Sequence, residues 1–131
     1  MSFATDLRRF ALSTGIRTDQ IVRKVCLDLT RDLVRLTPVD TGLARSNYFF
    51  GSEQRNDGKD TALVKSGAPS LVRSGQFAAT LKAGGVYYIT NNLPYILQIT
   101  QYGTSIQAAP GSLTKLTANW QNRLDRLARS L

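Results

Sequence analysis

The sequence predicts a single α+β domain in which an antiparallel β-sheet packs against N-terminal and C-terminal helices. Three observations support this prediction. The chain of 131 residues has the ordinary length of one domain. Segments with helical periodicity lie near both ends and flank two aromatic stretches that favour strands. No internal repeat, low-complexity tract or long linker divides residues 1–131. The order helix, strands, helix, strand, helix is typical of a sheet covered on one side by helices.

The first predicted elements are two helices. The shorter one is expected over about residues 4–12. The longer one begins with Thr18 as N-cap and ends before Pro38, because a proline disfavours the helical conformation of the residue before it. Its apolar residues recur at helical spacing and form one face: Ile21, Val22, Val25, Cys26, Leu29, Leu33 and Leu36. On this face we expect Cys26 to be a small core residue rather than a reactive thiol.

The middle of the chain alternates strand-like and turn-like segments. Asp40 or Thr41 caps a short helical turn, and "NYFFGS" predicts the first strand. The polar stretch "SEQRNDGKDT" contains an Asn-Asp-Gly turn signal and is either a hairpin tip or a mobile loop. "TALVKSG" is a weaker candidate for a returning strand. "SLVRSGQFAATLKAGG" predicts a short helix with Ser74 as a candidate N-cap and an end at Gly84-Gly85.

The last third of the chain predicts one strand and two helices. "VYYIT" is the second good strand, and "LPYILQITQYG" favours a helix with Pro94 in its first turn. The uncharged connector "GTSIQAAPGS" precedes the closing helix, which carries an apolar stripe with spacings of 3 and 4 residues: Leu113, Leu116, Trp120, Leu124, Leu127 and Leu131. This stripe is shorter than three heptads, so we favour packing on its own domain over packing on a neighbouring chain.

The composition argues against enzyme activity. The sequence has one cysteine and no histidine, so it lacks an internal disulfide, a zinc site of the Cys/His type and a His-activated nucleophile. It also lacks the GxxxxGK[ST], GxGxxG and GxSxG patterns. Asp28 and Asp32 share a helix face with arginines, which is typical of solvated ion pairs. We expect a non-enzymatic protein without cofactor or metal.

The charge distribution leaves two interpretations open. The formal net charge is +8, and no Asp or Glu occurs from Thr61 to Leu124. That stretch retains Lys65, Arg73, Lys82, Lys115 and Arg123. The surplus indicates either a basic face that meets nucleic acid or an acidic protein, or a soluble basic protein without a specific anionic partner. The aromatic residues are not interleaved with Lys and Arg as in a groove for single-stranded nucleic acid.

The sequence gives no sign of a membrane or secretory segment. No apolar run approaches the roughly 20 residues that a transmembrane helix needs. The first residues, "MSFATDLRRFALSTG", lack the apolar stretch of a secretory signal. We therefore expect no membrane partner, and a protein made in a cytoplasm that stays there or enters an assembly formed there.

Two segments resemble one protein family. Residues 37–51, "TPVDTGLARSNYFFG" (the first motif), resemble the "TPVDTGRARxNW" segment of small neck or tail-completion proteins of tailed bacteriophages, typified by gene product ten of the HK97-type siphophages. Residues 87–112, "YYITNNLPYILQITQYGTSIQAAPGS" (the second motif), resemble the family's "YITNNLPYAxxLEYGTSKQAPAGMV" segment. Both occur in the family's order and separation. The chain departs from the family pattern at Gln101, where a Glu is common, and at Ile106, where a Lys is common.

The resemblance implies a virion structural protein of the neck. It implies a homo-oligomeric ring, with six subunits favoured, between head-completion or adaptor proteins and the tail terminator or tail tube, with non-specific contact to genomic DNA in the channel as a further expectation. The same resemblance makes the uncharged connector an arm that reaches a neighbouring subunit. The candidate interface residues are Asp40, Thr41, Gly42, Arg45, Asn91, Asn92, Tyr95, Tyr102, Gly103, Thr104, Ser105, Gln107 and Pro110. Two alternatives remain: a tail terminator ring protein, and a basic nucleic-acid-binding module.

Overall fold

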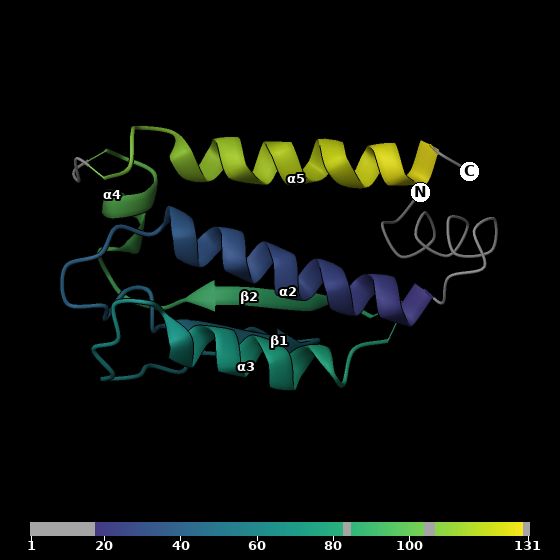
Figure 1. Cartoon of the computed structure of the whole chain (residues 1–131), viewed down its shortest axis with the longest axis horizontal. Helices are drawn as coiled ribbons and strands as arrows, with labels where there is room; N and C mark the ends of the chain where they lie inside the picture. The colour runs from purple at the N-terminus through teal and green to yellow at the C-terminus, as the bar shows by residue number, and fades with distance from the viewer. Residues whose placement is uncertain (1–17, 83–84, 104–106, 130–131) are drawn as a thin grey trace.

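The computed structural model describes residues 18–82, 85–103 and 107–129, so the helix expected over residues 4–12 lies outside the described part (Figure 1). The described residues form a two-stranded sheet and four helices. In chain order the elements are α2 (Thr18–Leu36), β1 (Tyr48–Ser52), α3 (Ala68–Ala78), β2 (Tyr87–Asn91), α4 (Ile96–Thr100) and α5 (Ser112–Arg129).

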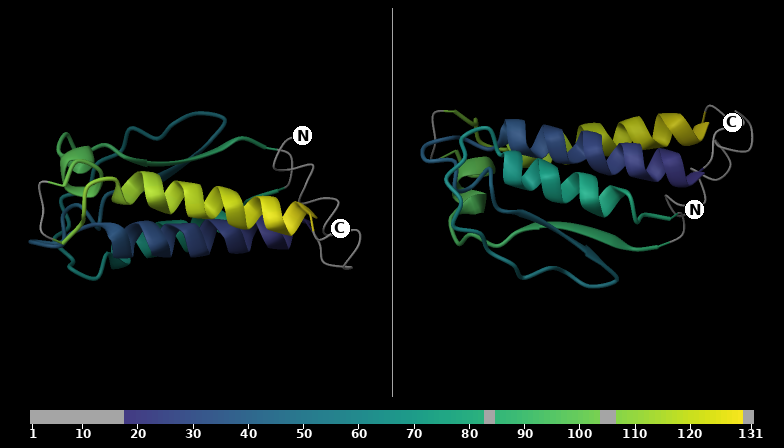
Figure 2. Two further views of the ribbon diagram at one scale, coloured as in Figure 1. Left: turned by 90° about the horizontal axis from the view of Figure 1, so that it is seen from above. Right: turned by 60° about the horizontal axis from the view of Figure 1, so that its bottom comes forward.

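The sheet is antiparallel and carries the helices on one side. In its register Phe50 pairs with Ile89, and Tyr48 pairs with Asn91. Helix α3 packs against β1 and α2, and α5 packs against α2 (Figure 2). The predicted α+β class with helices over an antiparallel sheet is therefore confirmed. The stretch 61–67, a candidate returning strand, forms no strand, because the Val64 carbonyl accepts hydrogen bonds from the Gly67 N–H and the Ser46 hydroxyl instead of pairing in a ladder.

The core lies between α2, α3 and the sheet. Its buried apolar members are Val22, Cys26, Leu33, Val34, Tyr48, Phe50, Ala78 and Leu81. Cys26 is 8% exposed, which confirms it as a core residue, and burial raises the pKa of its thiol. The rings of Phe50 and Phe77 lie 5.5 Å apart, and Phe77 meets Tyr87 edge-on at 6.0 Å. Such aromatic pairs contribute about 0.5–1.5 kcal/mol each beyond the apolar area they bury.

Helix α3 differs from its predicted boundaries. It begins at Ala68, after Gly67 in the left-handed conformation (φ 75°), and contains a proline in its first turn. That proline lacks an N–H and fits a position where no helical partner exists, and the N-cap residue Gly67 has no side chain that could cap the helix. Ser74 as N-cap was therefore wrong: it lies mid-helix, 1% exposed, against the core. The helix also ends at Ala78, before the predicted stop at Gly84-Gly85.

The polar segment after β1 folds back over the outer face of the sheet, opposite the helices, and is not a hairpin tip (Figure 2). Asn56 donates its amide N–H to the Phe50 carbonyl at 3.1 Å, and the Thr90 hydroxyl donates to the Asn56 carbonyl at 2.8 Å. Asp60 pairs with Arg73 at 3.0 Å. These contacts hold the segment to both strands.

Helix α5 packs on α2 of its own chain, as predicted. Trp120 is 6% exposed, and its indole N–H donates to the Asp32 carboxylate at 2.9 Å. The Arg123 guanidinium lies over the Trp120 ring, 4.5 Å from its centre, and reaches Asp28 at 4.0 Å. Leu113 and Leu116 join the edge of the core. Leu113, Leu116 and Trp120 of the apolar stripe thus serve the fold of the single chain.

Candidate functional site

The two motifs meet at one end of the molecule, where α2 ends and α4 and α5 lie close by (Figure 1). The Gln107 side chain makes the link. Its carbonyl oxygen accepts from the Val39 N–H at 2.8 Å, and its amide N–H donates to the Val39 carbonyl at 2.8 Å. A glutamine from the second motif thus imitates a strand partner for the backbone of the first motif.

A pocket of about 260 Å³ lies between the motifs. Residues 38–44 line one side, and Tyr95, Ile99 and Gln107 line the other. Asp40 is exposed and forms no ion pair within the described part of the chain. Thr41 accepts a hydrogen bond from the Leu43 N–H at 3.3 Å, so it supports the short helical turn as one of its two candidate caps. The wall thus combines backbone and apolar side chains with one carboxylate, Asp40.

Two glycines of the candidate set are required by the backbone. Gly42 has a φ of 93°, and a Cβ there would lie 2.3 Å from the Val64 carbonyl carbon. Gly103 has a φ of 76°, and a Cβ there would lie 2.4 Å from Cγ of Pro110. Both positions combine a left-handed conformation with close packing, so only glycine fits them without strain. Both glycines therefore shape the backbone of the site.

Arg45 is turned inward. Its Nε–H donates to the Thr37 carbonyl at 2.7 Å, and Nη1 donates to the Lys65 carbonyl at 3.2 Å. The Thr37 carbonyl follows directly after α2, where backbone carbonyls lack helical partners. Arg45 therefore caps the end of α2 with its positive charge, which also suits the helix dipole. Its role in the single chain is to position the first motif.

Asn91 and Asn92 tie three segments together. The Asn91 amide donates to the Ala44 carbonyl at 3.0 Å, which links β2 to the first motif. The Asn92 amide donates to the carbonyls of Asn56 and Gly58 at 2.8 and 2.9 Å. The two asparagines therefore hold the first motif and the polar segment after β1 in place. Like Arg45, both asparagines donate hydrogen bonds to backbone carbonyls of their own chain.

The exposed members of the site are mainly aromatic and apolar. Tyr95 is 38% exposed and Tyr102 is 63% exposed, and Leu97 on α4 between them is 46% exposed. We call these three residues the α4 patch. Pro110 is also exposed and lies against Gly103. Thr104 and Ser105, which belong to the candidate set, lie outside the described residues.

The described part of the connector packs on its own subunit. Ala108 is 4% exposed, Gln107 is bound to Val39, and the Gly111 N–H donates to the Gln101 carbonyl at 2.7 Å. Residues 107–112 thus do not extend away as the arm that the resemblance implied. An uncharged segment packs equally well against its own chain, because no ion needs to be buried.

Gln101 has a role that the sequence pattern did not reveal. Its side-chain oxygen accepts from the Thr114 N–H at 2.9 Å, and its amide N–H donates to the Thr114 hydroxyl at 2.6 Å. Gln101 therefore caps the first turn of α5 from outside the helix. In the sequence, Gln101 stands where a Glu is common in the family pattern, and this difference does not indicate a capping role. A long-range cap has no local sequence signal.

Arg73 is the second residue that sequence reasoning missed. It comes from the carboxylate-free stretch, yet its Nε–H donates to the Tyr48 carbonyl at 3.0 Å and its Nη2 donates to the Ser46 carbonyl. Its guanidinium also lies 4.0 Å from the centre of the Phe49 ring. The N–H of Ala62 and the Arg73 side chain both bind Asp60 and hold the pKa of its carboxyl below the ordinary value.

Comparisons with known proteins gave no match: no family model, no curated protein and no solved structure is similar to this chain. Within residues 18–82, 85–103 and 107–129, no helix is long and apolar enough to cross a bilayer. Among the same residues, no group of three Cys, Asp or Glu side chains is placed to hold a metal ion. The candidate site therefore rests on the two motifs and their geometry.

Proposed function

We propose that this chain is a non-enzymatic structural protein of the bacteriophage neck, a tail-completion protein that forms a ring joining head to tail. The observation that carries the proposal is the pair of motifs, which resemble one family in order and separation and which also meet in space through Gln107 and Val39. Such a virion protein is made in the host cytoplasm and binds head-completion proteins on one side and the tail tube or its terminator on the other.

The α4 patch supports an assembly role. Tyr95, which lines the pocket between the motifs, exposes apolar surface, as do Leu97 and Tyr102. Aromatic residues are enriched in the buried centres of protein interfaces, where charged residues are depleted. A patch of this kind that meets a different surface on the next copy generates a ring when the rotation closes. The resemblance favours six subunits.

The internal roles of Arg45, Asn91 and Asn92 fit the same proposal. Hydrogen bonds within the chain hold these side chains, so the pocket and the α4 patch are presented on a fixed frame. A pre-organised surface loses less conformational entropy when a partner binds. The candidate set thus contains residues that are held inside the chain, which we call the frame (Arg45, Asn91 and Asn92), and exposed residues such as Tyr95 and Tyr102.

The proposal is tested by inactivating the gene in the phage that encodes the chain. We expect DNA-filled heads and complete tails to accumulate unjoined, and electron microscopy of the lysate measures the fraction of joined particles. Supplying the intact gene in trans should restore joining. Joined, infectious particles at normal yield without the gene would refute the proposal.

A second measurement addresses the ring. Light scattering of the purified protein, alone and with isolated heads or tails, gives the mass of what forms. A species near six times 14.4 kDa, or a monomer that becomes a ring only on those particles, is expected. A stable monomer that binds neither particle would contradict the assembly role. The position of the ring in the virion separates tail completion from the tail terminator.

A further inference from the structure

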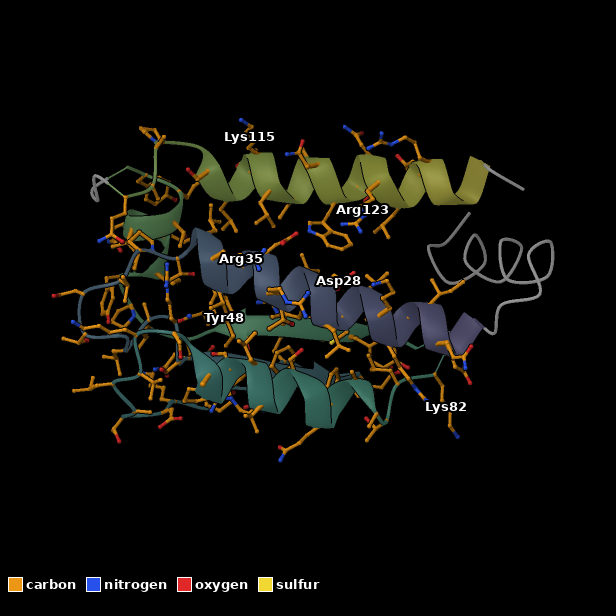
Figure 3. All side chains as sticks on the ribbon, viewed as in Figure 1. Asp28, Arg35, Tyr48, Lys82, Lys115 and Arg123 are labelled. Atoms are coloured by element: carbon orange, nitrogen blue, oxygen red, sulfur yellow. The ribbon has the colours of Figure 1, made fainter. Side chains whose placement is uncertain are left out.

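Exposed cations occur along two helices that pack against each other. Helices α2 and α5 lie side by side and run in opposite directions, and Arg35, Lys115 and Arg123 lie along them (Figures 1 and 3). The side chains of Lys24, Arg31 and Arg123 are 74%, 54% and 53% exposed. The α2–α5 basic face consists of Lys24, Arg31 and Arg35 from α2 and Lys115, Arg123 and Arg126 from α5.

The cations form two rows, one on α2 and one on α5, and each row is long enough to contact several phosphates of a nucleic-acid backbone. Residues 24–35 and 115–126 each span roughly 16 Å along a helix at 1.5 Å per residue. Duplex DNA carries one negative charge per about 1.7 Å of its axis, so several phosphates lie within that span. The rows are also adjacent, because Asp28 contacts Lys24 at 3.2 Å from one helix and Arg123 at 4.0 Å from the other.

The carboxylates on this face do not neutralise it. Asp28 is shared by Lys24, Arg31 and Arg123. Asp32 accepts the indole N–H of Trp120, and Asp125 accepts a hydrogen bond from Gln121. Six cations therefore surround three carboxylates, each of which already has a partner within the chain, and positive charge remains in excess.

The uncharged residues of the face suit phosphates better than a protein. On the side of α5 that carries Lys115 and Arg126, the exposed neutral polar side chains are Asn119 and Asn122, which follow at helical spacing. Phosphate oxygens are contacted mainly by Arg, Lys, Ser, Thr, Asn and Gln, whereas the centres of protein interfaces are depleted in Lys and enriched in aromatic residues. A hollow of about 320 Å³ between α2 and α5 is lined by the donors Lys115, Asn119 and Arg123 and by Asp32, above an apolar floor of Leu36, Leu116 and Trp120.

The opposite side of the molecule has a different charge balance. The segment after β1, which covers the outer face of the sheet (Figure 2), carries Glu53, Asp57 and Asp60 with Arg55 and Lys59. In addition, Arg45 and Arg73 donate hydrogen bonds to backbone carbonyls of their own chain. Among the described residues, Lys65 and Lys82 are also exposed, but they are separate from one another, whereas six cations lie together on the α2–α5 basic face.

From this arrangement we infer that the α2–α5 basic face binds the phosphate backbone of duplex DNA without reading its sequence. The face presents no exposed aromatic side chain for stacking on bases within the described residues, so the binding energy is electrostatic. Affinity falls steeply as salt displaces the contacts. The inference does not depend on the neck role, because an isolated chain would show the binding.

The test is fluorescence anisotropy of the purified full chain with a labelled 20-base-pair duplex, titrated at salt concentrations from 50 to 200 mM. The slope of log K against log salt should be about −3 to −5, since each phosphate contact contributes about −0.9. The double variant R35Q/K115Q removes one cation from each helix. It should weaken binding and reduce the size of the slope by about 2. A second duplex of unrelated sequence should bind equally well.

The matched control is K65Q/K82Q, which removes two exposed cations that lie away from the α2–α5 basic face (Figure 3 labels Lys82). It should leave the slope unchanged. Equal losses in both double variants would refute the assignment to this face, as would the absence of binding by the original chain at 50 mM salt. If the chain instead self-associates and R35Q/K115Q abolishes that association without any DNA binding, the face is a protein interface. Circular dichroism confirms that both variants fold.

Discussion

Gln107 and Val39 are joined by two hydrogen bonds of 2.8 Å each, although 68 positions separate them in the sequence. The pairing connects the first and second motifs with the geometry of a β-bridge. It fixes the width of the pocket between them, because both residues line that pocket. Gln107 therefore contributes to the stability of the end of the molecule that carries the α4 patch, together with Arg45 and Asn91.

Replacing Gln107 tests this contribution. Gln107→Ala removes both hydrogen bonds and should lower the free energy of unfolding by about 1–2 kcal/mol, since a typical protein hydrogen bond contributes about 0.5–1.5 kcal/mol net. Gln107→Glu keeps the acceptor for the Val39 N–H but sets a carboxylate oxygen against the Val39 carbonyl, so it should not retain the stability of the original chain. Urea denaturation followed by circular dichroism measures both. Gln54→Ala, in the exposed polar segment, is the control, with an expected effect within about 0.5 kcal/mol.

The glycines of the chain offer a second test with opposite signs. Gly42→Ala should destabilise by more than about 2 kcal/mol, because it forces a left-handed residue and a Cβ into the backbone of residues 64–65. Gly75→Ala should stabilise by about 0.5–1 kcal/mol, because Gly75 lies within α3 and a Cβ there meets no atom within 4 Å. Thermal unfolding of both variants checks the pair. Equal changes in stability for the two variants would contradict the close approach of the Val64 backbone to Gly42.

The Asp60–Arg73 pair predicts a pH dependence. The pKa of Asp60 is held below its unfolded value of 3.8, so the native state binds fewer protons there than the unfolded state does. The stabilisation from this group is therefore complete above that value and is lost as pH falls through the lowered native pKa. Asp60→Asn should thus be less stable than the original chain at pH 7, and the difference should shrink near pH 3.

Urea unfolding of both proteins at the two pH values gives the answer. Asp57→Asn is the control, because Asp57 is an exposed carboxylate of the same segment. It should change stability little at either pH. A difference between the original chain and Asp60→Asn that stays constant from pH 7 to pH 3 would count against the ion pair.

The α4 patch can be tested in assembly. Tyr95→Ser with Tyr102→Ser removes two exposed aromatic side chains without touching the frame, so the variant should fold normally but fail to form rings or to restore head–tail joining. Leu71→Ser with Val72→Ser is the matched control, because both residues are exposed on α3, at 37% and 58%. Light scattering and complementation of the inactivated gene compare the two. Normal joining by the tyrosine variant would exclude the patch as the contact.

Local signals predicted the helices better than the rest of the fold. Helix α2 follows its apolar spacing and ends at Leu36 as Pro38 indicated, because these signals act within a few residues, whereas Thr18 is its first helical residue and not the residue before the helix. The start of α3 was misread, because Ser74 resembles a cap while Gly67 and the following proline begin the helix without one. Residues 61–67 look like a strand but bind the turn at Gly42 instead, which is a tertiary effect.

The candidate site was predicted by residue identity but not by role. The motifs located Arg45, Asn91 and Gln107, yet the structure uses all three to satisfy backbone groups of the same chain. Sequence alone cannot distinguish a donor needed inside the chain from one offered to a partner, because both are polar residues in a turn-rich segment. The roles of Gln101 and Arg73 could not be predicted either, because their hydrogen-bond partners, Thr114 and Tyr48, are distant in the sequence.

Trp120 is the one tryptophan of the chain, and it lies at the contact between α2 and α5. Its fluorescence is therefore a built-in spectroscopic reporter of that contact. Emission from an indole that is 6% exposed and bound to Asp32 should shift to longer wavelength when water reaches the ring. Detachment of α5 would then be visible before the far-ultraviolet signal of the remaining helices changes. A ligand that binds Arg123 should also change the fluorescence of Trp120, since that guanidinium lies over the ring.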